Sequence, residues 1–105
     1  MTQAVSIADN GEVACVAITV AKPGFEAKVR KALEDLIEPV RAEQGCLQYD
    51  LHIDLNSEGR FAFVERWVNL DDFNAHCVAP HINDYLQLTD GWLDHAQHFP
   101  MKRIG

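Results

Sequence analysis

Cysteines, basic residues and long hydrophobic runs are all scarce in this sequence. Only three cysteines occur among 105 residues, at positions 15, 46 and 77, and they form no C-x-x-C pair. This small, odd number argues against a disulfide framework and indicates reduced, buried thiols in a cytoplasmic protein. No segment approaches the roughly 18 apolar residues of a membrane span. The N-terminus also lacks the basic region of a signal peptide.

Positive charge is limited as well. Nine Lys and Arg residues stand against sixteen Asp and Glu residues, which gives a formal net charge of −7. Proteins that bind nucleic acids or anionic membranes need basic patches, so we expect neither kind of partner. The acidic balance identifies no partner by itself, because acidic surfaces serve mainly solubility.

The usual cofactor motifs are missing. The sequence has no glycine-rich phosphate loop, no G-x-S-x-G and no dinucleotide-binding fingerprint, so we expect no nucleotide cofactor. His76 and His81 are separated by Pro80 and do not have a recognised metal-ligand spacing. His95 and His98 fall on opposite faces of an expected strand. We therefore expect no metal site.

The hydrophobic pattern predicts one domain over residues 12–105, preceded by a short flexible arm at residues 1–11. Strands are expected where β-branched residues cluster or apolar and polar residues alternate, and helices where the apolar spacing is 3.6 residues. The expected elements are a strand at 13–21, a helix at 25–44 kinked or ended by Pro39, strands at 46–55 and 60–68 around a hairpin loop at 56–59, a short helix capped by Asn69, a helix started by Pro80, and a strand at 94–104.

This order of elements is that of the ferredoxin-like split βαβ fold, an α+β architecture with an antiparallel sheet. Such a sheet carries its helices on one face and leaves the other uncovered. The first strand has apolar residues on both faces. We therefore expect two copies to pack sheet against sheet as a homodimer.

The segment Phe63-Val64-Glu65-Arg66-Trp67 draws attention to a candidate site. Strand alternation places Phe63, Glu65 and Trp67 on one face. A carboxyl between two aromatic residues is costly to bury unless it is paired or protonated. Glu65 is therefore either a catalytic acid or base with a raised pKa, or a structural carboxylate bonded to nearby donors. Trp67 either lines a cavity for an aromatic ligand or packs in the core.

The next helix adds His76, at the margin of the apolar stripe formed by Leu70, Phe73 and Cys77. An imidazole titrates near ~6.5, which suits proton transfer, but a histidine bonded to a carbonyl remains an equal alternative. On the helix that follows, His81 and Tyr85 are candidates for polar contacts with a ligand.

Three segments together resemble the antibiotic biosynthesis monooxygenase family. They are RAEQGCLQY at residues 41–49, FVERW at 63–67, and FNAH at 73–76 followed by APH at 79–81. The resemblance covers roughly residues 12–104 and implies a dimeric α+β barrel with a pocket between sheet and helices. It also implies that enzymes of this type oxidise quinols, anthrones or related aromatics with O₂ and without flavin, haem or metal.

The resemblance carries the catalytic roles to Glu65, Trp67 and His76, with Trp67 as pocket wall and N–H donor. A substrate pocket of this kind would be lined by Tyr49, Phe63, Phe73, His81 and Tyr85. The protein must supply a base, an aromatic cavity and donors for an oxyanion, while the substrate anion reduces O₂ itself.

The sequence departs from some branches of this family. Haem-degrading relatives use an Asn on the first strand, which residues 13–21 lack. Relatives that isomerise sugar phosphates need cationic ligands, and no basic cluster can be placed in the expected pocket. A non-oxidative isomerase and a non-catalytic ligand-binding dimer remain alternatives to a cofactor-free monooxygenase.

Overall fold

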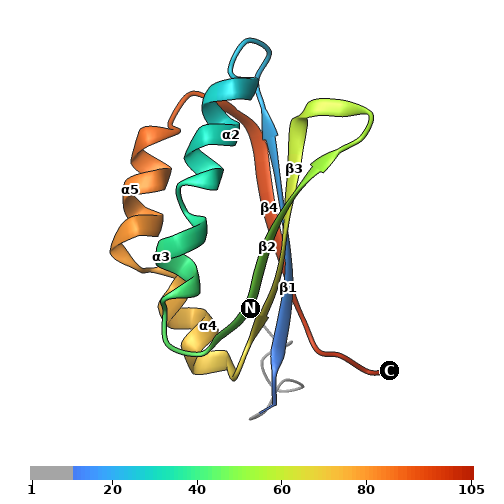
Figure 1. Ribbon diagram of the computed structural model, residues 1–105, viewed down its shortest axis with the longest axis vertical. Helices are drawn as coiled ribbons and strands as arrows, with labels where there is room; N and C mark the ends of the chain where they lie inside the picture. The colour runs from blue at the N-terminus through green and yellow to red at the C-terminus, as the bar shows by residue number, and fades with distance from the viewer. Residues whose placement is uncertain (1–10) are drawn as a thin grey trace.

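The computed structural model describes residues 11–105, so the arm expected at 1–11 lies almost wholly outside the described residues. The elements along the chain are β1 (Val13–Ala21), α2 (Glu26–Glu34), α3 (Ile37–Arg41), β2 (Cys46–Asp54), β3 (Ser57–Trp67), α4 (Leu70–Cys77), α5 (Pro80–Leu88) and β4 (Leu93–Met101). All the helices lie on one side of a single sheet, and no described helix covers the other side (Figure 1).

The sheet confirms the ferredoxin-like prediction. Its strand order is β2-β3-β1-β4, and each pair of neighbours is antiparallel. The two central strands, β1 and β3, are therefore separated in the chain by helices α2 and α3 and by strand β2. As expected from Pro100, β4 lies at an edge of the sheet, where a missing N–H costs least.

The helix predicted at 25–44 is interrupted, as expected from Pro39, but the break comes earlier than predicted and two short helices occupy the segment. Helix α2 ends at Glu34, and α3 begins at Ile37. Pro39 is the cause, because it has no N–H to donate to the carbonyl of Asp35, four residues earlier, and its ring crowds that carbonyl. The regular helix therefore breaks before the proline rather than at it.

The hairpin also differs from the prediction. The turn is Leu55-Asn56, and residues 57–59 belong to β3 instead of a four-residue loop. The carboxylate of Asp54 accepts the Asn56 backbone N–H at 2.7 Å, a local bond that stabilises such a turn. The strand pairing then shifts between Ile53 and Asp54, which absorbs the extra residues of β3 as a bulge. At the other end of the chain, β4 stops at Met101 and not at 104.

The predicted start signals of the last two helices are confirmed. The Asn69 side chain accepts the Asp72 backbone N–H at 2.8 Å and caps α4. The Asp72 carboxylate does not complete a capping box; it accepts a hydrogen bond from the Gln44 side chain at 3.3 Å. Pro80 is the first residue of α5, where its missing N–H is harmless.

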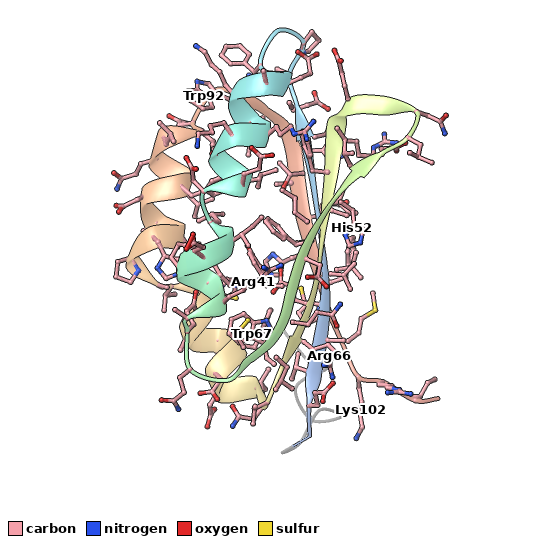
Figure 2. The ribbon with its side chains drawn as sticks, viewed as in Figure 1. Arg41, His52, Arg66, Trp67, Trp92 and Lys102 are labelled. Carbon is pink, nitrogen blue, oxygen red and sulfur yellow. The ribbon has the colours of Figure 1, made fainter. Side chains whose placement is uncertain are left out.

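Strand register decides which side chains face the helices. Trp67, Glu65 and Phe63 lie opposite Val13, Cys15 and Ala17 of β1. They face the helices and pack with the core, whose other members are Ala21, Val29, Leu33, Leu36, Val40, Tyr49, Phe61 and Phe73. Figure 2 shows Trp67 on the helix side of the sheet, and His52 and Arg66 on the opposite side.

Candidate functional site

Glu65 is a buried carboxyl at the centre of the helix-facing side of β3. Only 4% of its surface is exposed, and Trp67 is fully buried. The Trp67 indole Nε1–H donates a hydrogen bond to Glu65 Oε1 at 3.0 Å. Burial raises the pKa of Glu65, while the Trp67 hydrogen bond and the nearby His76 and His98 partly oppose that rise. The carboxyl therefore holds its proton to a higher pH than an exposed glutamate.

His76 lies deeper than its place on the helix predicts. It is 6% exposed, and its ring lies against Trp67 with a centroid separation of 4.6 Å and a tilt of 31°. Its Nε2 is 3.8 Å from Glu65 Oε1, and its Nδ1 is 3.0 Å from Glu43 Oε2. The imidazole thus stands between two carboxyl groups.

Glu43 is the site residue that sequence reasoning missed. It lies between α3 and β2, and besides His76 it contacts His81 Nε2, with a separation of 2.5 Å from its Oε2. It falls within the RAEQGC segment used for the family resemblance, which was the one available signal. No periodicity marked it, because its contacts join the end of α3 to the two later helices.

A cavity of about 330 Å³ opens between the sheet and helices α2, α4 and α5. Its wall includes the predicted residues Tyr49, Phe63, Glu65, Phe73, His76 and Tyr85, together with Cys15, Cys77, Ile82 and His98. Tyr49 and Phe63 stack with ring centroids 4.0 Å apart. Among the described residues, the wall contains no Lys or Arg. The cavity wall is therefore mainly aromatic and aliphatic, and its polar side chains include Glu65, His76, Tyr85 and Thr19.

The phenol of Tyr85 is an unpartnered polar group in this wall. Its hydroxyl is buried and makes no hydrogen bond of normal geometry to residues 11–105. Burial raises the pKa of Tyr85, although the nearby hydroxyls of Thr19 and Thr89 oppose the rise. A buried hydroxyl without a partner is costly, so this group is available to a bound ligand.

Two predicted residues do not line the cavity. Trp67 lies behind Glu65 and donates its N–H to that carboxyl. It therefore packs in the core and does not form the wall. His81 is turned to Glu43 and also stays out of the wall. Trp67 contacts the wall through Glu65, whereas His81 is connected to it only through Glu43 and then His76.

This arrangement suits proton transfer beside an aromatic molecule. A bound hydroxyl that reaches both the Glu65 carboxyl, whose pKa is raised, and the imidazole nitrogen 3.8 Å from it can exchange a proton with either group, out of bulk water. Burial also raises the pKa of the Cys15 thiol to about 12, so this cavity cysteine is a poor nucleophile.

The described residues show neither a metal-binding cluster nor a membrane-spanning helix. Residues 11–105 contain no cluster of His, Cys, Asp and Glu side chains arranged to hold a metal ion. In this part of the chain, no helix has the length and apolar character needed to cross a membrane.

Comparison with known proteins identifies relatives of this chain. Residues 13–88 match the family model described as antibiotic biosynthesis monooxygenase. Rv0793 of Mycobacterium tuberculosis, named as a candidate monooxygenase, is 32% identical over 73 residues, which are 70% of this chain and 71% of that protein. The uncharacterised protein sll1783 of Synechocystis is 28% identical over 66 residues, which are 63% of this chain and only 45% of that protein.

Solved structures agree with the sequence matches. PA3566 from Pseudomonas aeruginosa superposes with a TM-score of 0.85 at 27% identity, over 90% of this chain and 96% of that one. The structure of Rv0793 gives a TM-score of 0.84 at 25% identity, over 90% and 97% of the two chains. The shared structure therefore extends over nearly the whole described domain.

Proposed function

The chain belongs to the antibiotic biosynthesis monooxygenase family, and from this premise we propose that it is a cofactor-free monooxygenase acting on a quinol or anthrone-type aromatic. The observation that carries the proposal is the aromatic cavity with Glu65 and His76 in its wall. Its volume of about 330 Å³ lies within the usual range of small-molecule sites. A flat fused-ring phenol matches both this size and the stacked Tyr49 and Phe63.

The reaction proceeds through the substrate anion. A base in the wall takes a phenolic proton, and His76 Nε2, beside Glu65, is the group assigned to this step. The electron-rich anion then reduces O₂. One oxygen atom enters the ring and the other leaves as water, so that a quinol and O₂ become a hydroxyquinone and water. Glu65 shuttles the proton, and the Tyr85 hydroxyl, which lies near the Thr19 and Thr89 hydroxyls, donates to the substrate oxygen.

The cavity wall also argues against one alternative. A sugar-phosphate isomerase needs cations for the phosphate, and the described wall has no Lys or Arg. The acid and histidine in the wall favour an enzyme over a passive binding protein. No separate observation favours a second function strongly enough to propose it.

A homodimer is part of this proposal. On the sheet face away from the helices, Val16 of β1 lies directly opposite Val64 of β3 and Phe99 of β4. Phe99 is 44% exposed, so a second copy would cover an apolar stripe there. Sedimentation velocity should give a dimer for the wild type and a folded monomer for Val16→Glu. A wild-type monomer at tens of micromolar would refute this arrangement.

Oxygen uptake with a freshly reduced naphthoquinol tests the reaction. The purified protein, checked by absorbance for bound flavin and haem, should consume O₂ saturably above the autoxidation rate without protein. His76→Gln and Glu65→Gln should each lower kcat about 10²-fold or more, as expected for loss of a proton-transfer group. Uptake equal to the control for quinol and anthrone substrates alike would reject the monooxygenase assignment.

The matched control is His52→Gln. His52 lies on β2, pairs with Ala62 on the sheet face away from the cavity, and is exposed. This variant should keep wild-type kcat and KM, provided sedimentation gives the same assembly. A comparable loss in His52→Gln and His76→Gln would show that the assay reports histidine content or folding and not this site.

A further inference from the structure

Glu43 makes an unusual pair of contacts. Its carboxylate lies 3.0 Å from His76 Nδ1 and 2.5 Å from His81 Nε2, and its side chain is only 13% exposed. The three residues come from different elements: Glu43 from the segment between α3 and β2, His76 from α4 and His81 from α5. One partly buried carboxylate thus ties two helices to the helix-to-strand junction.

These contacts determine where the hydrogens must be. A carboxylate has only acceptor atoms, so each imidazole nitrogen that bonds to it must carry a hydrogen. His76 is then protonated at Nδ1 and His81 at Nε2. In a neutral His76 ring, Nε2 keeps a free lone pair, and this atom is the one that faces Glu65 at 3.8 Å.

The surroundings also fix the orientation of the His76 ring. One face lies against Trp67, with centroids 4.6 Å apart, and the Tyr49 ring meets it edge-on at 5.8 Å and 69°. A half-turn of the ring would exchange nitrogen for carbon at both ends. It would lose the bond to Glu43 and the approach to Glu65 together.

We propose that Glu43, anchored by His81, is a positioning residue that holds His76 in its Nδ1–H tautomer and presents Nε2 to the cavity as the proton acceptor. The acceptor role rests on the proposed monooxygenase function, whereas the tautomer does not. Glu43 touches no substrate in this scheme. It acts through His76, as the third group of a nucleophile–base–carboxylate arrangement acts through its histidine.

The direct test is the ¹⁵N spectrum of the two imidazole rings. Long-range ¹H–¹⁵N correlation of ¹⁵N-histidine protein, followed through a pH series and assigned with His76→Gln and His81→Gln, reports which nitrogen carries the hydrogen. Neutral His76 in the wild type should be protonated at Nδ1. A wild-type ring protonated at Nε2 overturns the proposal, and this result needs neither a variant nor a substrate.

Glu43→Gln gives the second test. The carboxylate accepts a hydrogen bond from both imidazoles, whereas the amide accepts one through its oxygen and must donate to the other ring through its NH₂ group. His76 should lose its single tautomer. The value of kcat for quinol oxidation should fall about 10²–10⁴-fold, with KM changed less than about threefold. Glu38→Gln, an exposed glutamate on α3, is the control and should match the wild type in spectrum and rate.

The outcomes separate the two proposals. In one outcome, His76 loses its single Nδ1–H tautomer in Glu43→Gln, and the wild type shows no oxygen uptake. This result supports the positioning role and rejects the oxygenase function. Active wild-type enzyme with an unchanged tautomer and rate in folded Glu43→Gln rejects the positioning role. If kcat of Glu43→Gln falls by the predicted factor but His76 keeps its Nδ1–H tautomer, the positioning role is also rejected.

Discussion

The hydrogen bond between the Trp67 indole and Glu65 gives the sharpest stability prediction. Both side chains are buried, and the bond length is 3.0 Å. Trp67→Phe removes the N–H and leaves a buried carboxyl whose nearest imidazole nitrogen is 3.8 Å away, beyond hydrogen-bond distance. Glu65→Leu leaves the indole N–H without an acceptor instead. Each change therefore leaves one buried polar group unsatisfied.

The magnitudes follow from these two losses. A hydrogen bond to a charged group contributes about 1.5–3 kcal/mol, and the smaller ring of Phe adds roughly 1 kcal/mol of lost packing. Trp67→Phe should thus lower the free energy of unfolding by about 2–4 kcal/mol, a large share of a typical 5–15 kcal/mol. The double variant removes both partners and should lose about 1.5–3 kcal/mol less than the sum of the single losses.

Urea unfolding of the wild type, both single variants and the double variant at pH 8 gives this coupling energy. Chain concentration must be equal throughout, because association would add to the apparent stability. At pH 4, where Glu65 is protonated, the coupling should shrink toward the roughly 0.5–1.5 kcal/mol of a neutral hydrogen bond. A coupling energy below about 0.5 kcal/mol at pH 8 would refute the reasoning. Equal m-values for the four proteins would show that the small coupling energy does not come from a loss of two-state cooperativity.

Three further predictions concern the pH response, a helix cap and a tight turn. Burial raises the pKa of Glu65, so the stability it contributes is complete below its unfolded pKa of about 4.3 and is lost as pH rises through the folded pKa. The Tm of Glu65→Gln should therefore rise relative to the Tm of the wild type as the pH is raised from 4 to 8. A Tm difference that stays constant over this range would contradict the sign of the effect. Asn69→Ala should cost about 1 kcal/mol in urea unfolding, because the cap of α4 is lost; no loss would mean that water replaces the cap. Gly45→Ala should destabilise more, since φ is +80° and a Cβ would lie 2.2 Å from Asp72 Oδ2. Adding Asp72→Ala should relieve only the contact with the carboxylate, because the Cβ of residue 72 still lies 2.7 Å from the new Cβ, and the backbone strain of about 1–2 kcal/mol also stays; complete restoration would contradict this argument.

Local signals in the sequence predicted the elements well where one residue type dictates the geometry. Asn69 before α4 and Pro80 at the start of α5 have only one favourable place relative to a helix, and both are found there. The predicted boundaries of elements were wrong where neighbouring residues compete to set the backbone geometry. Pro39 acts on the carbonyl four residues earlier, so the break lies before it, and the hairpin turn shortened because Asp54 bonds to Asn56.

The candidate site divides in the same way. Period-two alternation was enough to place Phe63, Glu65 and Trp67 on one strand face, because successive side chains of a strand must alternate. It did not reveal that Trp67 lies behind Glu65 and that the cavity wall is formed by other aromatic residues. That distinction depends on how α4 packs across the sheet.

By itself, the sequence determined the order of elements, the sheet face that carries the acid, and the positions of the helix caps. These depend on contacts between residues close in the chain, whose spacing is fixed by backbone geometry. Only the tertiary structure decided that Glu43 meets His76 and His81, which lie 33 and 38 residues further along. Such a contact exists only after α3, α4 and α5 have packed on one face of the sheet, so no local pattern encodes it.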